Sequence, residues 1–267
     1  EMGSVELLTR EGEIEIAKRI EEGTRELMSA ISDWPGTVAA VIAEYDQVEA
    51  GERKLTDIIS GYLNPMEHVP SALAQQQAAE ALKVEASENN DDDDDDDSET
   101  IEEEEEHEGG LDPEEALQRF TAIRDQLKKT EKAIERYGRD SDSAKKNIEA
   151  LGELFKYLKL TPRQFDPLIA KVRLAVEKIR AEERKIMKFS IRYGKMPRKD
   201  FITLFPGNES NLDWTAGIIS ANPDWGPKLA EQEIEIHRSQ RKLAQVEKAS
   251  GMNIAQIKDI NRRLTMG

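Results

Sequence analysis

The chain has 267 residues, and its 37% apolar and 35% charged residues make it more polar than a typical domain. Its net charge of −17 comes almost entirely from residues 85–108, which hold sixteen acids and no lysine or arginine, so the other 243 residues are nearly neutral. The lack of cysteine excludes disulfide scaffolds and cysteine nucleophiles, and no apolar run approaches the ~20 residues that span a bilayer. Because the chain opens with Glu1 and shows no signal peptide, we expect a soluble, cytoplasmic piece of a longer protein.

Apolar residues recur at spacings of three and four along the first part of the chain, which is typical of helices. Thr9 is a candidate N-cap for a first helix that keeps one apolar side as far as Ile31. A Trp-Pro-Gly break at 34–36 separates it from a second helix over 38–48. We expect a short third helix over 55–59.

Residues 66–110 change character, passing from an Ala/Gln-rich stretch into seven consecutive aspartates and a run of five glutamates. Like charges at this density repel one another, and almost nothing in the segment can be buried. We therefore predict a disordered, solvated tether. The alternative is a specific role, such as mimicry of nucleic acid or occupation of a basic groove.

A second series of helices follows this segment. Asp112 as N-cap, Pro113 at the first helical position and Glu115 three residues on form a start signal, and Gly138 is the expected stop. Thr161-Pro162 repeats the pattern and opens a long helix that should reach about Tyr193, with a possible second start at Pro167. Further helices are expected over 148–158, 214–219, 228–249 and from Asn253 to Leu264. We predict an all-α fold, an irregular helical bundle with a disordered acidic insertion.

No pattern of catalytic residues stands out. The three histidines, His68, His107 and His237, are far apart, and no zinc-protease, nucleophile-elbow or phosphate-loop motif is present. We therefore predict that the chain is not an enzyme and that it has no catalytic residues, metal site or cofactor.

The stretch 171–199 is strongly basic, with eleven Lys or Arg against three Glu. Such a helix can face phosphates or an acidic protein surface. An ordinary solvated helix face is the simpler alternative, and screening by the acidic segment is a third. As protein-interaction residues we predict Arg173, Arg180, Arg184, Lys185 and Lys188.

Exposed aromatic rings among basic residues can stack on nucleic-acid bases. Tyr193 has the required spacing in IRYGK, but we expect it to be a core residue at a helix end. Trp214 and Trp225 are expected to form the local core of a small loop-and-helix insert.

Four strings resemble bacterial primary sigma factors of RNA polymerase, of the proteobacterial type. Residues 3–23, GSVELLTREGEIEIAKRIEEG, resemble conserved region 1.2. Residues 52–65, ERKLTDIISGYLNP, with the acidic run look like the start of the nonconserved insertion, and 201–209, FITLFPGNE, look like its interior. Residues 251–264, GMNIAQIKDINRRL, look like the approach to region 2.

The resemblance implies a chain that helps to direct RNA polymerase core to promoters for transcription initiation. It places region 1.2 beside the non-template single strand downstream of the minus-ten element. It places the insertion against the β′ clamp, where it aids promoter escape. The family's main DNA-reading segments are missing from this chain. The rival hypothesis is a structural helical module that docks proteins and contacts no DNA.

The resemblance directs attention to the start of the first helix. The candidate DNA-binding residues are Leu7, Arg10, Glu11, Gly12 and Glu13. Carboxylates accept hydrogen bonds from exocyclic amines of unstacked bases, Arg10 suits a phosphate, and Gly12 permits close approach. The alternatives are a core role for Leu7 and a helix-dipole role for the two glutamates.

The sequence divides into four predicted parts. Region 1.2 and the following helices occupy 1–65, and the acidic tether occupies 66–110. The helical insertion occupies 111–250, and the start of the helix leading into region 2 occupies 251–267. The predicted partners are the β′ subunit and promoter DNA, without a membrane or a small-molecule substrate, in a nucleoid-associated location.

Overall fold

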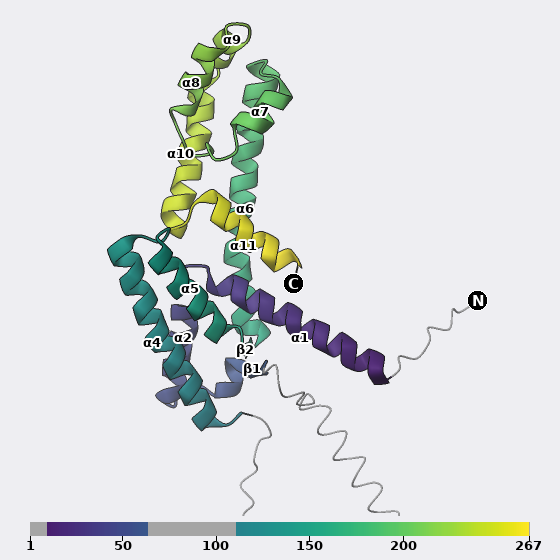
Figure 1. Ribbon diagram of the computed structural model, residues 1–267, viewed down its shortest axis with the longest axis vertical. Coiled ribbons are helices and arrows are strands. Elements are labelled where there is room, and N and C mark those ends of the chain that lie inside the picture. Colours follow the sequence, from purple (N-terminus) through teal and green to yellow (C-terminus); the bar gives the residue numbers. More distant parts are fainter. Residues whose placement is uncertain (1–9, 64–110, 267) are drawn as a thin grey trace, which may run out of the picture.

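A computed structural model describes residues 10–63 and 111–266 of the chain, and the predicted tether lies outside the described residues. The prediction of an all-α fold is confirmed, since helices dominate and a single pair of short strands is the only sheet in the described residues. The molecule is elongated, with a body below and a helical arm above (Figure 1). One continuous cluster of buried apolar residues runs through both parts.

The body is built from helices at both ends of the chain. They are α1 (Arg10–Ser32), α2 (Thr37–Glu49), α4 (Pro113–Tyr137), α5 (Asp142–Phe155) and α11 (Ile254–Met266). α4 and α5 form an antiparallel hairpin, and α1 packs against both α5 and α11. Segments that are far apart in the sequence therefore share one core.

The predicted start and stop of α4 are both present. The Asp112 side chain accepts a hydrogen bond from the backbone N–H of Glu114 at 2.9 Å, and Pro113 takes the first helical position. Glu115 does not complete the reciprocal cap, because its carboxylate pairs with Arg119 one turn later. Gly138 ends the helix at a φ of 80°, a conformation that glycine adopts without steric cost.

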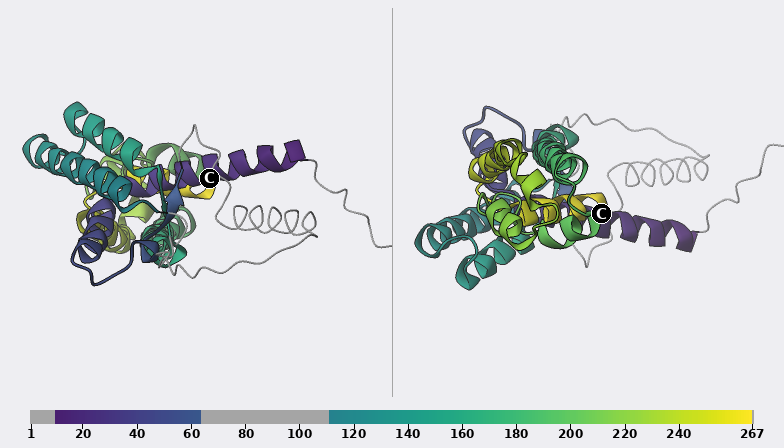
Figure 2. Two further views of the ribbon diagram at one scale, coloured as in Figure 1. Left: turned by 90° about the horizontal axis from the view of Figure 1, so that it is seen from below. Right: turned by 90° about the horizontal axis from the view of Figure 1, so that it is seen from above.

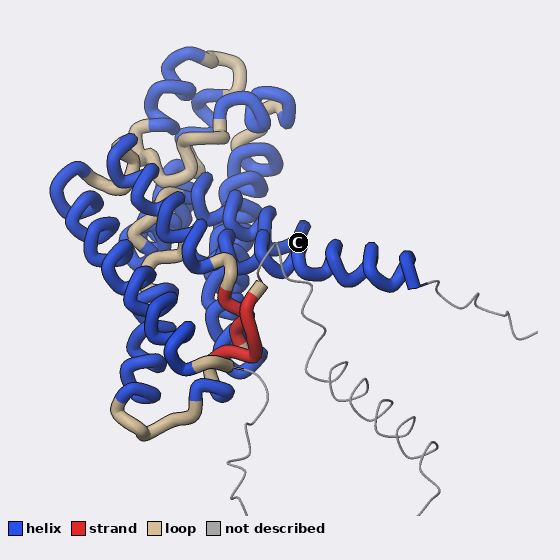
Figure 3. Tube along the Cα trace, turned by 60° about the horizontal axis from the view of Figure 1, so that its bottom comes forward, coloured by secondary structure: helices blue, strands red, loops and turns tan. Residues whose placement is uncertain are grey.

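The expected short helix over 55–59 is wrong in its second half. A 3-10 turn, η1 (Leu55–Asp57), leads into strand β1 (Ile59–Tyr62), which pairs antiparallel with β2 (Leu158–Leu160) (Figure 3). The predicted helix over 148–158 therefore ends early, at Phe155. Both strands are too short to give a clear alternating pattern, and the pairing partner of each lies about a hundred residues away.

The arm is a long antiparallel helix pair with a small helical tip. Its elements are α6 (Pro162–Met187), η2 (Lys188–Tyr193), α7 (Arg198–Leu204), α8 (Trp214–Ala221), α9 (Gly226–Ala230) and α10 (Glu233–Ser250). α6 and α10 pack along their length, and α6 also packs against α11 of the body (Figure 1). The last turn of the long helix, η2, is a π-helix, and Gly194 follows it as predicted.

Two expectations about the arm need correction. Pro167 does not start a second helix but lies inside α6, so the loss of one backbone donor there does not interrupt the helix. The helix expected over 228–249 is divided, because α9 ends at Ala230 and α10 begins at Glu233. The predicted local core is confirmed, since Trp214 and Trp225 are buried and Trp214 packs edge-on against Phe205.

Candidate nucleic-acid and protein interfaces

The start of α1 holds the predicted DNA-binding residues. Leu7 and the side chains of Arg10 and Glu11 lie outside the described residues. Gly12 is half-buried and Glu13 is exposed, both within the first turn or so of the helix. The geometry of a base pocket is therefore not tested, and these assignments stay predictions.

The first half of α1 projects from the body as a free-standing helix (Figure 2). Ile14, Ile16 and Ile20 are 36%, 42% and 64% exposed, although the sequence predicted Ile14 and Ile20 on a buried apolar side. Full burial begins only at Met28, where α1 enters the body. Among the described residues, the start of α1 is therefore exposed to solvent.

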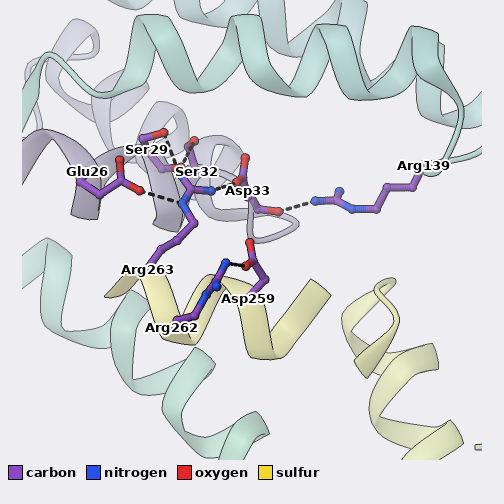
Figure 4. A network of polar contacts seen from close by, with 8 residues as sticks. All are labelled: Glu26, Ser29, Ser32, Asp33, Arg139, Asp259, Arg262 and Arg263. Carbon is purple, nitrogen blue, oxygen red and sulfur yellow. Dashed lines mark hydrogen bonds and ion pairs between the residues drawn. The ribbon is translucent and has the colours of Figure 1, made fainter. Parts of the chain in front are cut away.

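The second half of α1 is held by one arginine from α11 (Figure 4). The guanidinium of Arg263 donates to Glu26 at 2.8 Å, to Asp33 at 2.5 Å and to the Ser29 hydroxyl at 3.0 Å. All three partners lie on α1 or directly after it. This fork fixes the direction of α1 relative to the helix at the other end of the chain.

The carboxyl of Asp33 is the most buried acid of this network. Burial raises its pKa, and the opposing attraction of Arg263 and Arg139 does not cancel that effect. Arg139, from the α4–α5 connection, donates to the backbone oxygen of Asp33, and burial lowers the pKa of its guanidinium. For Arg263 burial acts in the same downward direction, but its hydrogen bond to Glu26 and the charge of Asp33 raise the pKa overall.

A cleft of about 750 Å³ lies beside this network, between α1, α5 and α11. Its walls carry both signs of charge, including Asp33, Arg139, Glu149, Asp259 and Arg263. Within the described ranges, no group of three or more histidine or acidic side chains is placed to hold a metal ion. Nor is any described helix both long and apolar enough to cross a membrane.

The basic stretch forms an exposed face on α6. Arg173, Arg180 and Arg184 follow one another at spacings of seven and four, which puts them on one side of the helix. All three are exposed, and none has a carboxylate within ion-pair distance in the described part of the chain. Lys185 is also exposed but pairs with Glu182 at 2.7 Å, and the Lys188 ammonium lies 5.8 Å from the Tyr193 ring.

Two of the three acids inside this stretch contact the neighbouring helices. Glu182 pairs with Lys242 of α10 at 3.4 Å, and Glu183 pairs with Lys258 of α11 at 2.5 Å. Burial raises the pKa of Glu182, but its hydrogen bonds from Lys185 and Ser239 and the nearby positive charges lower it overall. Glu177 is exposed on the same side of α6 as Arg173 and Arg180. Because the other two carboxylates pair with lysines of neighbouring helices, the solvent side of α6 still keeps a net positive charge.

Comparison with known proteins accounts for almost the whole chain. Residues 34–247 match the family described as Sigma-70, non-essential region, and residues 1–26 match Sigma-70 factor, region 1.2. The chain belongs to the sigma-70 family. The resemblance inferred from the four strings is thereby confirmed.

One relative of this chain is the RNA polymerase sigma factor RpoD of Neisseria gonorrhoeae. The two sequences are 32% identical over 268 residues, an alignment that covers 99% of this chain and 42% of the relative. The sigma-70 chain described here thus spans about two fifths of that relative's length. By the family ranges, the projecting half of α1 lies within region 1.2 and the arm lies within the non-essential region.

Sequence reasoning missed the residues that orient α1. Glu26, Asp33, Arg139 and Arg263 belong to three separate segments. Arg263 lies in the string 251–264, but that string gave no indication of its partners. The only local signal in the sequence is an arginine within an amphipathic helix, and its half-buried position is visible only in the structure. The partner of that arginine is fixed by tertiary packing.

Proposed function

We propose that the chain is the part of a primary sigma factor that joins region 1.2 to region 2, and that the whole protein directs RNA polymerase core to promoters. The family match over most of the chain carries this proposal. Members of the sigma-70 family are non-catalytic initiation factors, so no enzymatic step is assigned. The protein acts in the cytoplasm, at the nucleoid.

The start of α1 serves as an accessory contact to the non-template single strand downstream of the minus-ten element. Its projection from the body and the exposure of Glu13 support this role. The carboxylates of Glu11 and Glu13 accept from base amines, Arg10 holds a phosphate, and Leu7 forms an apolar wall. Gly12 leaves room for the strand.

The exposed face of α6 serves as a contact to the β′ clamp and aids promoter escape. Its support is the row Arg173, Arg180 and Arg184, which have no carboxylate within ion-pair distance among the described residues, extended by Lys185 and Lys188. Exposed charges of this kind affect encounter and release more than they affect affinity.

The division of the chain into residues 1–65, 66–110, 111–250 and 251–267 also belongs to this proposal.

The test is a pair of variants in the full-length factor. Glu13→Ala should shorten the open-complex half-life about fivefold or more, because a single base contact contributes about 1–3 kcal/mol. Glu15→Ala, which removes another exposed glutamate of the same helix, is the matched control and should change the half-life less than twofold. Equal effects of both substitutions would contradict a specific base contact.

Arg180→Glu combined with Arg184→Glu should leave that half-life nearly unchanged and alter the ratio of abortive to productive transcripts. Lys129→Glu with Lys132→Glu makes the same charge change on the exposed side of α4 and is its control. If the α6 variant shortens the half-life as much as Glu13→Ala does, the face binds DNA. An unchanged ratio in the α6 variant would contradict the clamp contact, whereas an unchanged half-life in Glu13→Ala would support the rival hypothesis of a helical module that contacts no DNA.

A further inference from the structure

The tip of the arm carries a compact basic surface that the proposed function leaves unexplained. It surrounds the π-helical turn η2 and the start of α7, at the end of the molecule remote from the projecting half of α1 (Figure 1). All of its cations are exposed, and none has a carboxylate within ion-pair distance among the described residues. We call this set the tip cluster: Arg192, Lys195, Arg198 and Lys199. Lys188, which belongs to the α6 face, adjoins it.

An aromatic ring lies in the middle of the tip cluster. Tyr193 is 44% exposed, which corrects the expectation that it is a core residue at a helix end. The Lys188 ammonium and the Arg192 guanidinium lie 5.8 and 6.0 Å from its ring centre. The physical reason is the π-helical turn, which widens the helix end and rotates this ring outward while Phe189 and Ile191 stay partly buried.

The backbone holds this ring and these charges in place. The N–H of Met196 donates to the Ser190 oxygen at 3.0 Å, and both residues are buried. Gly194 is pressed against Leu229, so that a Cβ there would come within 2.8 Å of that side chain. The chain between η2 and α7 is therefore a fixed turn.

Lys195 in that turn has a φ of 58°, the left-handed conformation that glycine or asparagine usually occupies. It is the only non-glycine residue with positive φ in the described part of the chain. Residues with strained backbone often lie at functional sites, and the Lys195 side chain is long, exposed and charged. The strain is borne by a fixed turn, which keeps the exposed Lys195 two residues after Tyr193.

We propose that the tip cluster and Tyr193 bind single-stranded nucleic acid. Alternating bases and phosphates match a stacking ring flanked by cations that have no internal partner. Tyr137 provides the contrast within the same chain. It is 55% exposed and has Arg136 5.2 Å from its ring centre, but Glu131 and Glu135 lie in the same turns of α4. At the tip, no acidic residue occurs from 188 to 199, and the next acid, Asp200 in the first turn of α7, is half-buried.

The experiment measures binding of the full chain to a fluorescent twelve-nucleotide oligo-deoxythymidine by anisotropy, between 25 and 150 mM salt. Arg192→Glu with Lys195→Glu should weaken binding at least about tenfold at low salt. It should also reduce the slope of log K against log salt by about 1.4, because each phosphate contact contributes about 0.7. The control, Lys132→Glu with Arg136→Glu beside Tyr137, should change binding less than twofold.

The ring is tested separately from the charges. Tyr193→Leu should weaken binding at least about fivefold without changing the salt slope, since a stacked base contributes about 1–3 kcal/mol. Tyr193→Phe should retain binding, and Tyr137→Leu should leave it unchanged. Circular dichroism and thermal unfolding establish that each variant is folded.

Three results would overturn the proposal. An equal loss in the tip and control charge variants would mean general electrostatic attraction. Unchanged binding in Tyr193→Leu, or equal affinity for a duplex of the same length, would exclude base stacking. Competition by poly-glutamate at equal charge concentration would show that the tip is a surface for acidic protein. None of these results bears on Glu13 or on the α6 face, so the proposed function is tested independently.

Discussion

The Nε of Arg263 donates to Oε1 of Glu26 at 2.8 Å and thereby joins two helices whose contacting residues are 237 positions apart in the sequence. The same guanidinium reaches Asp33 and Ser29, so one side chain from α11 holds the point at which α1 leaves the body. The projecting half of α1 lies before Met28, where full burial starts, and the second half of the helix packs against α5 and α11. Its direction therefore depends on this contact together with the packing of α1 against α5 and α11.

Replacing Arg263 should destabilise the chain more than replacing its neighbour Arg262. Arg263→Met leaves Asp33 half-buried with a weaker partner, and we expect a loss of about 1–2 kcal/mol in the free energy of unfolding, between the values for exposed and buried pairs. The Arg262 and Asp259 side chains are 71% and 49% exposed, so Arg262→Met should cost less than about 0.5 kcal/mol. Denaturant unfolding of both variants measures the difference, and equal losses would contradict the role of the fork.

The stacked pair of Tyr45 and Phe120 should be a main joint between the segments on either side of residues 64–110. Their ring centres are 3.9 Å apart at an interplanar angle of 4°, and Phe120 is completely buried. Phe120→Ala should reduce the free energy of unfolding by about 3–5 kcal/mol, since it removes a buried ring and leaves a cavity. Leu117→Ala, on the exposed side of α4, should cost less than about 0.5 kcal/mol by the same urea titration. Similar midpoints for the two variants would show that α2 and α4 are held together elsewhere.

Features with local causes were predictable from the sequence. The last helix was expected to begin at Asn253, whose side-chain oxygen accepts from the N–H of Gln256 at 2.9 Å. The Gln256 side chain in turn accepts from the Asn253 N–H at 3.0 Å. The stops at Gly138 and Gly251 follow from left-handed or otherwise positive φ that glycine tolerates. In each case the residues that interact lie within one helical turn.

Features that depend on distant partners were not predictable. Ile59 pairs with Leu160 in the sheet, and neither segment shows a strand pattern on its own. The outward ring of Tyr193 depends on a π-helical turn, which differs from an α-helix by one residue and has no sequence signature. The candidate DNA-binding residues came from resemblance, whereas their support by Arg263 came only from the fold.

Asp33 should give the chain a stability term that falls as the pH rises. Burial raises its folded pKa above 3.8, so the folded state holds the proton more tightly than the unfolded chain does. Its contribution is complete at lower pH and is lost as the pH rises through the folded pKa. Relative to Asp33→Asn, the wild-type chain should therefore lose stability from about pH 3.8 upward, as measured by urea unfolding at a series of pH values. A difference that grows in favour of wild type with rising pH would show that Arg263 outweighs burial.

Tyr62 should ionise later than an exposed tyrosine. Burial is the main cause, and Glu115 adds to it, while Arg119 opposes both; together they raise its pKa to about 12. The Arg119 guanidinium lies 4.4 Å from the ring centre, and the hydroxyl is buried without a hydrogen-bond partner among the described residues. Because the folded pKa is raised, the stability from this group is present below the ordinary value near 10 and is lost as the pH rises through about 12.

A stopped-flow pH jump followed by tyrosinate absorbance reads this ionisation before the chain unfolds. In the wild-type chain one component should stay protonated at pH 11 and appear only near pH 12 or on unfolding. Tyr62→Phe should remove that late component, whereas Tyr137→Phe should remove an early one, because Tyr137 is 55% exposed. If the late component survives in Tyr62→Phe, it comes from Tyr45, whose pKa is also raised by burial. The packing of β1 against α4 would then be looser than the contact between Tyr62 and Arg119 implies.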